Sequence, residues 1–207
     1  MDDIEFLYEG NNPMLQTLLG AASDQWDISQ SDLIENMLKV GFHESAGTFD
    51  PSLQQIGGGP GVGIYQYEKD RPGVYNEEGK EFINQGASTA INRLIAINDI
   101  DNGINLWDKE EGQPGWINDL INNNYDVGQL TAEQQHLIFL ADKMRDPTAS
   151  FKGIDTDEKL AVQWADEHQA GTKPGTPERK AILNKFLKDT IEFEKQLNKQ
   201  PLEIMIP

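Results

Sequence analysis

The chain has 207 residues, of which 37% are hydrophobic and 25% are charged, proportions typical of a globular protein and not of a disordered one. Its 17 Lys and Arg residues against 35 Asp and Glu residues give 17 − 35 = −18 charges at pH 7. A surface this acidic repels phosphate backbones and anionic lipids, so nucleic-acid binding is disfavoured.

Metal centres and membrane segments are also disfavoured by the sequence. The chain has no cysteine, which excludes disulfides, thiolate nucleophiles and Cys-ligated zinc. The segment HESAG has Gly47 where the zinc motif HExxH needs its second histidine. No apolar run approaches the ~18 residues that span a bilayer. The acidic first ten residues lack the basic and apolar regions of a secretory signal peptide. We therefore expect no metal, no cofactor, no membrane insertion and no signal peptide.

Two helices are expected in the first quarter of the chain. The first opens at Pro13, with its leucines on one side. For the second, Ser29 followed three residues later by Asp32 resembles a capping box, and apolar residues then recur at helical spacing. This second helix is expected to reach Glu44 and to end near Gly47.

A glycine-rich stretch and a short β-hairpin should follow. Residues 57–63 contain five glycines and cannot form a helix. Residues 64–67 read Ile-Tyr-Gln-Tyr and have strand character, residues 71–73 form a turn signal, and residues 74–75 can return as a second strand.

The rest of the chain is expected to be helical. Apolar spacing predicts helices over residues 80–98, 116–121 and 160–168, a capping box predicts one opening at Thr131, and Thr176-Pro177-Glu178 starts the last. The predicted fold is mainly α, one helical domain with a small hairpin beside the helix end at Glu44. The expected organisation is an N-terminal extension or docking segment (1–25), this domain (26–200) and a C-terminal tail (201–207).

Glu44 is the residue whose setting suggests chemistry. A glutamate at a helix end is most often a solvated carboxylate. An acid at a helix C-terminus is however unfavourable against the helix dipole, which hints that other contacts hold it there. Phe42 precedes it, the small residues 45–47 follow it, and a strand is expected to approach it. A carboxyl partly desolvated in this way has a raised pKa and can act as a general acid near neutrality.

The glycines and two other side chains have simpler interpretations. The spacing over residues 57–63 fits neither GxGxxG nor GxxxxGK[ST], and a helix precedes it where a phosphate loop needs a strand. The glycines are either a flexible surface loop or a place where backbone approaches a ligand such as a sugar chain. Trp164 and His168 share an apolar helix face and are interpreted as packed side chains. His43 is adjacent to Glu44 on a helix and should point away from it.

The segment from Glu44 to Tyr67 resembles the phage tail lysozyme family, part of the lysozyme-like superfamily with goose-type lysozymes and lytic transglycosylases. The matching stretches read Glu44-Ser45-Ala46-Gly47, Asp50-Pro51 and Gly63-Ile64-Tyr65-Gln66-Tyr67. Downstream, residues 130–144 (LTAEQQHLIFLADKM) and 164–186 (WADEHQAGTKPGTPERKAILNKF) are similar to later helices of that family. The resemblance covers roughly residues 30–190.

The resemblance implies an α+β lysozyme-like fold and an enzyme that cleaves the β-1,4 bond between N-acetylmuramic acid and N-acetylglucosamine in peptidoglycan. By position, Glu44 is implied to be the general acid. Ser45 is implied to support the helix end and to bind substrate together with Gln66 and Tyr67, which are implied to face it. It further implies a protein of the phage virion, in the tail or ejected, that acts on the bacterial cell wall and contacts other virion proteins.

The identity of a second catalytic acid stays open. Inverting hydrolysis needs a second carboxyl ~6.5–9.5 Å from the first, and retaining hydrolysis needs one at ~5–5.5 Å. Asp50, Glu68 and Asp70 are the candidates. A lytic transglycosylase needs none, because one glutamate acts first as acid and then as base while the 6-hydroxyl of the substrate attacks. Both reactions are kept as alternatives.

The net charge of −18 bears on how such an enzyme meets its substrate. It supplies no electrostatic steering toward an anionic cell wall. An enzyme carried by a particle and held at the wall does not need steering, because its local concentration is high. A catalytically inactive lysozyme-like domain, serving as a structural or glycan-binding part of a tail, is the alternative from another functional class. A cytoplasmic protein unrelated to cell walls is the remaining one.

Overall fold

The computed structural model describes residues 12–57, 59–68, 86–99, 103–146, 150–168 and 171–199. These residues form a mainly helical domain with one small antiparallel hairpin, as the sequence predicts. The helices are α2 (Pro13–Trp26), α3 (Gln30–Glu44), α4 (Ala87–Asp99), α5 (Gly115–Asn122), the 3-10 helix η1 (Val127–Gln129), α6 (Ala132–Arg145), α7 (Asp157–His168) and α8 (Pro177–Lys199). The strands are β1 (Gly61–Val62) and β2 (Tyr67–Glu68). Within the described ranges, no helix combines the length and apolarity needed to cross a membrane.

Capping side chains begin the first helices where the sequence predicts them. The Asn12 carboxamide oxygen accepts hydrogen bonds from the backbone N–H groups of Met14 and Leu15, at 2.9 and 3.1 Å. Ser29 Oγ accepts one from the Asp32 N–H at 3.1 Å. At α6 the predicted capping box is complete, with Thr131 and Gln134 bonded reciprocally.

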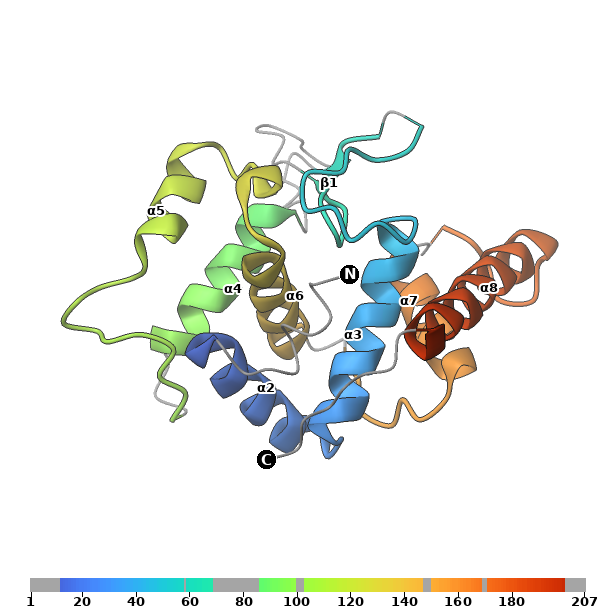
Figure 1. The fold of residues 1–207 in the computed structure, drawn as a ribbon, viewed down its shortest axis with the longest axis horizontal. Helices are drawn as coiled ribbons and strands as arrows, with labels where there is room; N and C mark the ends of the chain where they lie inside the picture. The colour runs from blue at the N-terminus through green and yellow to red at the C-terminus, as the bar shows by residue number, and fades with distance from the viewer. Residues whose placement is uncertain are drawn as a thin grey trace, which may run out of the picture.

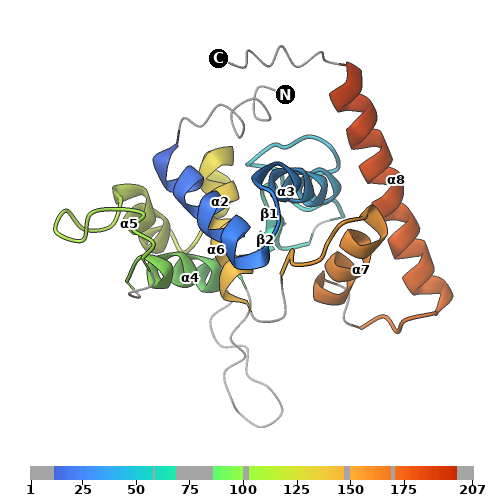
Figure 2. The same ribbon diagram turned by 90° about the horizontal axis from the view of Figure 1, so that it is seen from below.

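Helix α3 lies between two groups of helices (Figures 1 and 2). On one side α6 packs against both α2 and α4, and on the other side α7 packs against α8. Helix α3 contacts α2 of the first group and α8 of the second. The leucines of α2 are fully buried in the core, so the expected domain boundary between residues 25 and 26 falls inside a core helix. The C-terminal end of α3 therefore lies at the junction of the two groups of helices.

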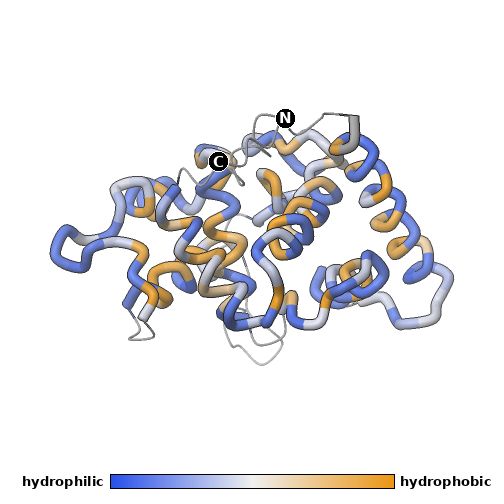
Figure 3. The backbone as a smooth tube through the Cα atoms, turned by 60° about the horizontal axis from the view of Figure 1, so that its bottom comes forward, coloured by the Kyte–Doolittle hydropathy of each residue, from blue (hydrophilic) through white to orange (hydrophobic). Residues whose placement is uncertain are grey.

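The last helix, α8, buries one face. Along α8, hydrophobic and hydrophilic segments alternate (Figure 3), and the side chains turned inward are Phe186, Thr190 and Phe193, all 1% exposed or less. This spacing of three and four residues is the amphipathic helix period. Between the two groups, Lys39 of α3 is buried and pairs with three carboxylates: Glu35 and Asp157 at 2.7 Å and Glu194 at 3.0 Å.

The hairpin differs from the expected one. Gly61 pairs with Glu68 and Val62 with Tyr67, so the strand expected over residues 64–67 is wrong except at its last residue. Residues 63–66 form the turn, because Gly63 and Gln66 have φ angles of +86° and +51°, which a strand does not allow. The return strand expected over residues 74–75 lies outside the described residues.

One buried amide fixes the turn of the hairpin to α6. Gln135 Oε1 accepts a hydrogen bond from the Ile64 N–H at 2.8 Å. Its Nε2 donates to the carbonyl oxygens of Pro51 and Val127, at 2.8 and 2.9 Å. Gln135 is 1% exposed and joins the Ile64 N–H to the Pro51 and Val127 carbonyl oxygens, the last of which also accepts a hydrogen bond from the Leu130 N–H at 3.0 Å.

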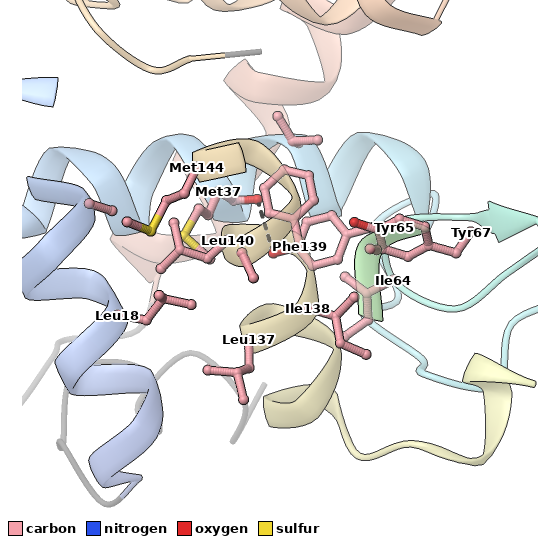
Figure 4. Close-up of a cluster of buried hydrophobic side chains, with 14 of the residues drawn as sticks. Leu18, Met37, Ile64, Tyr65, Tyr67, Leu137, Ile138, Phe139, Leu140 and Met144 are labelled. Carbon is pink, nitrogen blue, oxygen red and sulfur yellow. Dashed lines mark hydrogen bonds between the residues drawn. The ribbon is translucent and has the colours of Figure 1, made fainter. Parts of the chain in front are cut away.

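Aromatic packing holds the same turn. Figure 4 shows Ile64 and Tyr65 directed toward the buried side chains of α6. The Tyr65 ring stacks on Phe139 with centroids 3.8 Å apart, and its hydroxyl lies 2.7 Å from His136 Nδ1. Burial lowers the pKa of His136 to about 4, so this histidine is neutral at pH 7.

We expect Gln135→Leu to destabilise the protein by about 2–4 kcal/mol, because a leucine of similar size leaves the buried Ile64 N–H without its partner and removes the side-chain donor from the Pro51 and Val127 carbonyl oxygens. Urea unfolding measures the loss. Gln129→Leu, an exposed glutamine in η1, is the matched control and should stay within about 0.5 kcal/mol of the wild type. Equal midpoints for both variants would contradict the role given to Gln135.

Candidate active site

Glu44 is the last residue of α3, and the chain turns sharply after it. Gly47 has a φ of +80° and its N–H donates to the Phe42 carbonyl oxygen at 2.7 Å, which ends the helix. Ser45 is fully buried, and its Oγ accepts a hydrogen bond from the Phe49 N–H at 3.0 Å. Ser45 thus supports the helix end, and its burial does not fit the expected contact with substrate.

The Glu44 carboxyl points toward α7. Trp164 Nε1 donates a hydrogen bond to Glu44 Oε1 at 2.5 Å. His168 Nδ1 lies 3.8 Å from the same oxygen, too far for a hydrogen bond. The Glu44 side chain is 15% exposed, so the carboxyl is largely removed from water while part of it stays accessible.

Burial raises the pKa of Glu44 above its usual value. Three effects lower this pKa: the hydrogen bond from Trp164 and the positive charges of Lys143 and Lys185. Each lysine also has a partner of its own, because Lys143 pairs with Glu167 and Lys185 with Asp189. The removal from water exceeds these effects, and the carboxyl holds its proton to higher pH than an exposed glutamate.

An aromatic and imidazole cluster surrounds the Trp164 indole. The His43 ring meets it edge-on with centroids 4.3 Å apart, and the His168 ring stacks on it at 5.6 Å and 18°. The Phe186 ring lies 5.3 Å away on the α8 side. The indole is 7% exposed, so its position is fixed on several sides.

His43 points away from Glu44, as the helix geometry predicts. Its Nδ1 lies 2.7 Å from Asp189 Oδ2. Burial and the charge of Lys185 lower its pKa to about 4, against the opposing effect of Asp189. A histidine neutral at pH 7 in this position supports the indole by packing and does not compete with Glu44 for protons.

Gln66 and Tyr67, the expected substrate-binding residues, are engaged inside the protein. The Tyr67 side chain is buried and its hydroxyl donates to Asp142 Oδ2 at 3.2 Å. Gln66 Nε2 donates to the Gly63 carbonyl oxygen at 2.6 Å, within the turn. The turn does pack on α3, since a Cβ on Gly41 would come within 2.9 Å of the Ile64 side chain. The hairpin therefore lies near the end of α3 (Figure 1). Among the described residues, neither the Gln66 nor the Tyr67 side chain is hydrogen-bonded to Glu44.

The candidate second acids have different settings. Asp50 is exposed, and its Oδ1 accepts hydrogen bonds from the N–H and Oγ of Ser52, at 2.8 and 2.7 Å; these bonds lower its pKa. Glu68 ends β2 with an exposed side chain. Asp70 lies outside the described residues. For the part of the chain that is described, no contact joins Glu44 to Asp50 or Glu68.

Trp164 and His168 are the site residues that sequence reasoning assigned to the core. Their spacing of four residues puts them on one face of α7 with Leu160 and Ala161, which are core residues. Apolar spacing finds the buried face of a helix, and it contains no information about which distant side chain that face meets.

The geometry suits proton donation. A carboxyl whose pKa is raised by burial, which is held by a neighbouring donor and which stays partly accessible, can protonate a leaving group. Within the described ranges, no cluster of three or more His, Cys, Asp or Glu side chains is arranged to hold a metal ion. No family model matches this chain, and no similar protein was found among the curated proteins or the solved structures.

We expect Glu44→Gln to raise the melting temperature near neutral pH. The Glu44 pKa is higher in the folded state than in the unfolded state, so ionisation of Glu44 costs the folded state stability as pH rises above the unfolded value of 4.5. A glutamine carries no such cost. The gain should be largest at about pH 7.5 and should shrink at about pH 4, where both states hold the proton.

Thermal melts at the two pH values, monitored by circular dichroism, measure this difference. The exposed Glu111→Gln changes the net charge equally and serves as the matched control, for which we expect no pH-dependent gain. A Glu44→Gln gain that is the same at both pH values would show that the wild-type carboxyl is not desolvated.

Proposed function

We propose that this protein cleaves the β-1,4 glycosidic bond between N-acetylmuramic acid and N-acetylglucosamine in peptidoglycan, with Glu44 as the general acid. The observation that supports this most is the Glu44 carboxyl itself: it is desolvated at the end of α3, hydrogen-bonded by Trp164 and 15% exposed. It is the residue that the resemblance to phage tail lysozymes makes catalytic.

In the proposed reaction, Glu44 gives its proton to the oxygen that leaves as the glycosidic C–O bond breaks. Burial raises the pKa of Glu44, so the carboxyl holds this proton to higher pH than an exposed glutamate does. The positive charge that develops on the sugar ring is then met by water in a hydrolase or by the 6-hydroxyl of the same muramic acid in a lytic transglycosylase. The carboxylate left on Glu44 is stabilised by the Trp164 N–H and by Lys143 and Lys185.

The transglycosylase reaction is a second candidate because of Asp50. Its carboxylate oxygen is already occupied by two hydrogen bonds from Ser52, which hold it in a local turn. Glu68 and Asp70 are the other expected second acids for hydrolysis. A one-carboxylate mechanism requires none of the three.

A non-catalytic role in glycan binding is supported by a different observation. Gln66 and Tyr67, which the resemblance places against substrate, make internal hydrogen bonds. In a structural or glycan-binding domain of a phage tail, such a hairpin would act as a rigid element and need no open cleft. The acidic net charge of −18 is compatible with either role in a virion, where the particle delivers the domain to the wall.

The test is digestion of purified peptidoglycan, with the released muropeptides identified by mass spectrometry. We expect release by the wild type and a loss of about 100-fold or more in Glu44→Gln, the usual effect of removing a general acid. Products with a reducing end would identify a muramidase, and 1,6-anhydro products a lytic transglycosylase.

Three further variants complete this experiment. Glu111→Gln is the matched control and should keep wild-type activity. Glu68→Gln and Asp70→Asn distinguish the remaining second acids, because loss of activity in one of them with reducing-end products would identify the partner of Glu44. Binding to peptidoglycan without release by the wild type would overturn the enzyme and leave the glycan-binding domain.

A further inference from the structure

The hydrogen bond between Trp164 and Glu44 is directed at one oxygen of the carboxyl. The donor is Trp164 Nε1 and the acceptor is Glu44 Oε1, at 2.5 Å. An indole N–H can only donate, so Oε1 must present a lone pair to it in every protonation state. When Glu44 is protonated, the hydrogen is then favoured on Oε2, the oxygen that Trp164 does not contact.

We propose that Trp164 is a positioning residue that holds Glu44 Oε1 as the acceptor and thereby assigns the acidic proton to Oε2. This rests on the proposed function, in which that proton goes to the leaving glycosidic oxygen. A carboxyl free to rotate about its last bond offers the proton in either of two directions. A carboxyl held by an indole offers it in one.

The same hydrogen bond, besides orienting the carboxyl, also favours loss of its proton. Once Glu44 has lost its proton, the N–H donates to a carboxylate, and a hydrogen bond to a charged acceptor is about twice as strong as one to a neutral acceptor. The bond therefore strengthens as the proton leaves, which stabilises the state that follows donation more than the state that precedes it.

The indole is built to stay in place. It is 7% exposed and is enclosed by the rings of His43, His168 and Phe186. His43 is in turn held by Asp189 of α8 at 2.7 Å. Three elements, α3, α7 and α8, thus fix the donor, and this agrees with a positioning role more than with simple filling of the core.

The other charged groups around Glu44 do not replace this donor. On α7, His168 Nδ1 is 3.8 Å from Oε1, its side chain is 36% exposed, and its pKa is lowered by burial and by the positive charge of Lys143. From α6, Lys143 acts at longer range and pairs with Glu167, which also lies 3.9 Å from His168 Nε2.

The groups on the remaining elements are likewise engaged elsewhere. From α8, Lys185 and Asp189 pair with each other at 3.0 Å. On α3 itself, His43 faces Asp189. We therefore expect ionisation of Glu44 to change the environment of the Trp164 indole N–H more than that of the neighbouring charged side chains.

The first measurement needs no change in Trp164. In wild-type protein labelled with ¹⁵N, the Trp164 indole resonance is followed against pH, and the Glu44 carboxyl is followed in protein labelled with ¹³C-glutamate, assigned with Glu44→Gln. We expect both to titrate with one midpoint, and the indole titration at that midpoint to vanish in Glu44→Gln. An indole resonance that does not follow Glu44 would overturn the proposal even if no Trp164 variant folds.

The second measurement uses Trp164→Phe, which keeps an aromatic ring in place and removes the N–H. We expect the Glu44 midpoint to rise by about one pH unit, because the lost bond favoured the carboxylate. Trp26→Phe, a second tryptophan at 3% exposure that packs edge-on against Phe151, is the matched control and should leave the midpoint unchanged. An unchanged midpoint in folded Trp164→Phe would overturn the assignment.

Activity then separates this proposal from the proposed function. In an active enzyme we expect Trp164→Phe to lower kcat by about 10-fold or more with little change in KM, and to move the alkaline limb of the pH–rate profile upward with the Glu44 midpoint. If the wild type releases nothing from peptidoglycan while both resonances titrate together, the hydrogen-bond assignment stands and the proposed reaction fails. If the wild type is active and Trp164→Phe keeps its kcat and pH profile, the positioning role fails alone.

Discussion

The removal of one carboxyl from water is the constraint on which the candidate site depends. Glu44 stands at the C-terminus of α3, where the helix dipole already disfavours negative charge, and burial adds to that cost. The carboxyl accepts a hydrogen bond from one direct donor, Trp164 Nε1, and two lysines, Lys143 and Lys185, act on it at longer range. A carboxyl kept in such a place for packing alone would be better replaced by an apolar side chain, which is why its setting indicates chemistry.

The position of α3 makes this setting possible. The helix lies between the group of α2, α4 and α6 and the pair of α7 and α8 (Figure 1), and its last residue accepts a hydrogen bond from α7 while Lys143 of α6 and Lys185 of α8 act on it at longer range. Lys39, five residues earlier, joins α3 to α7 through Asp157 and to α8 through Glu194. These two ion pairs help to hold α7, which carries Trp164, against α3.

The hairpin is fixed to α6, which belongs to the group of α2, α4 and α6. Gln135 of α6 bonds the turn, and Tyr65 stacks on Phe139 of the same helix. The site therefore consists of a carboxyl whose neighbours come from α7 and α8 and a hairpin held by α6.

The sequence by itself determined the helical class, the starts of the helices that Asn12, Ser29, Thr131 and Thr176 cap, and the end of a helix at Glu44. Those features depend on local chemistry: a side chain that caps a helix acts within three residues, and apolar spacing reports directly on a helix face. The hairpin register was predicted wrongly because residues 64–67 have strand-forming side chains, yet the Ile64 N–H is satisfied by Gln135, 71 residues away. Only the tertiary structure decided that Trp164 donates to Glu44 and that Tyr67 is buried against Asp142. The physical reason is that these two hydrogen bonds join side chains 120 and 75 residues apart along the chain, and local sequence carries no record of such contacts.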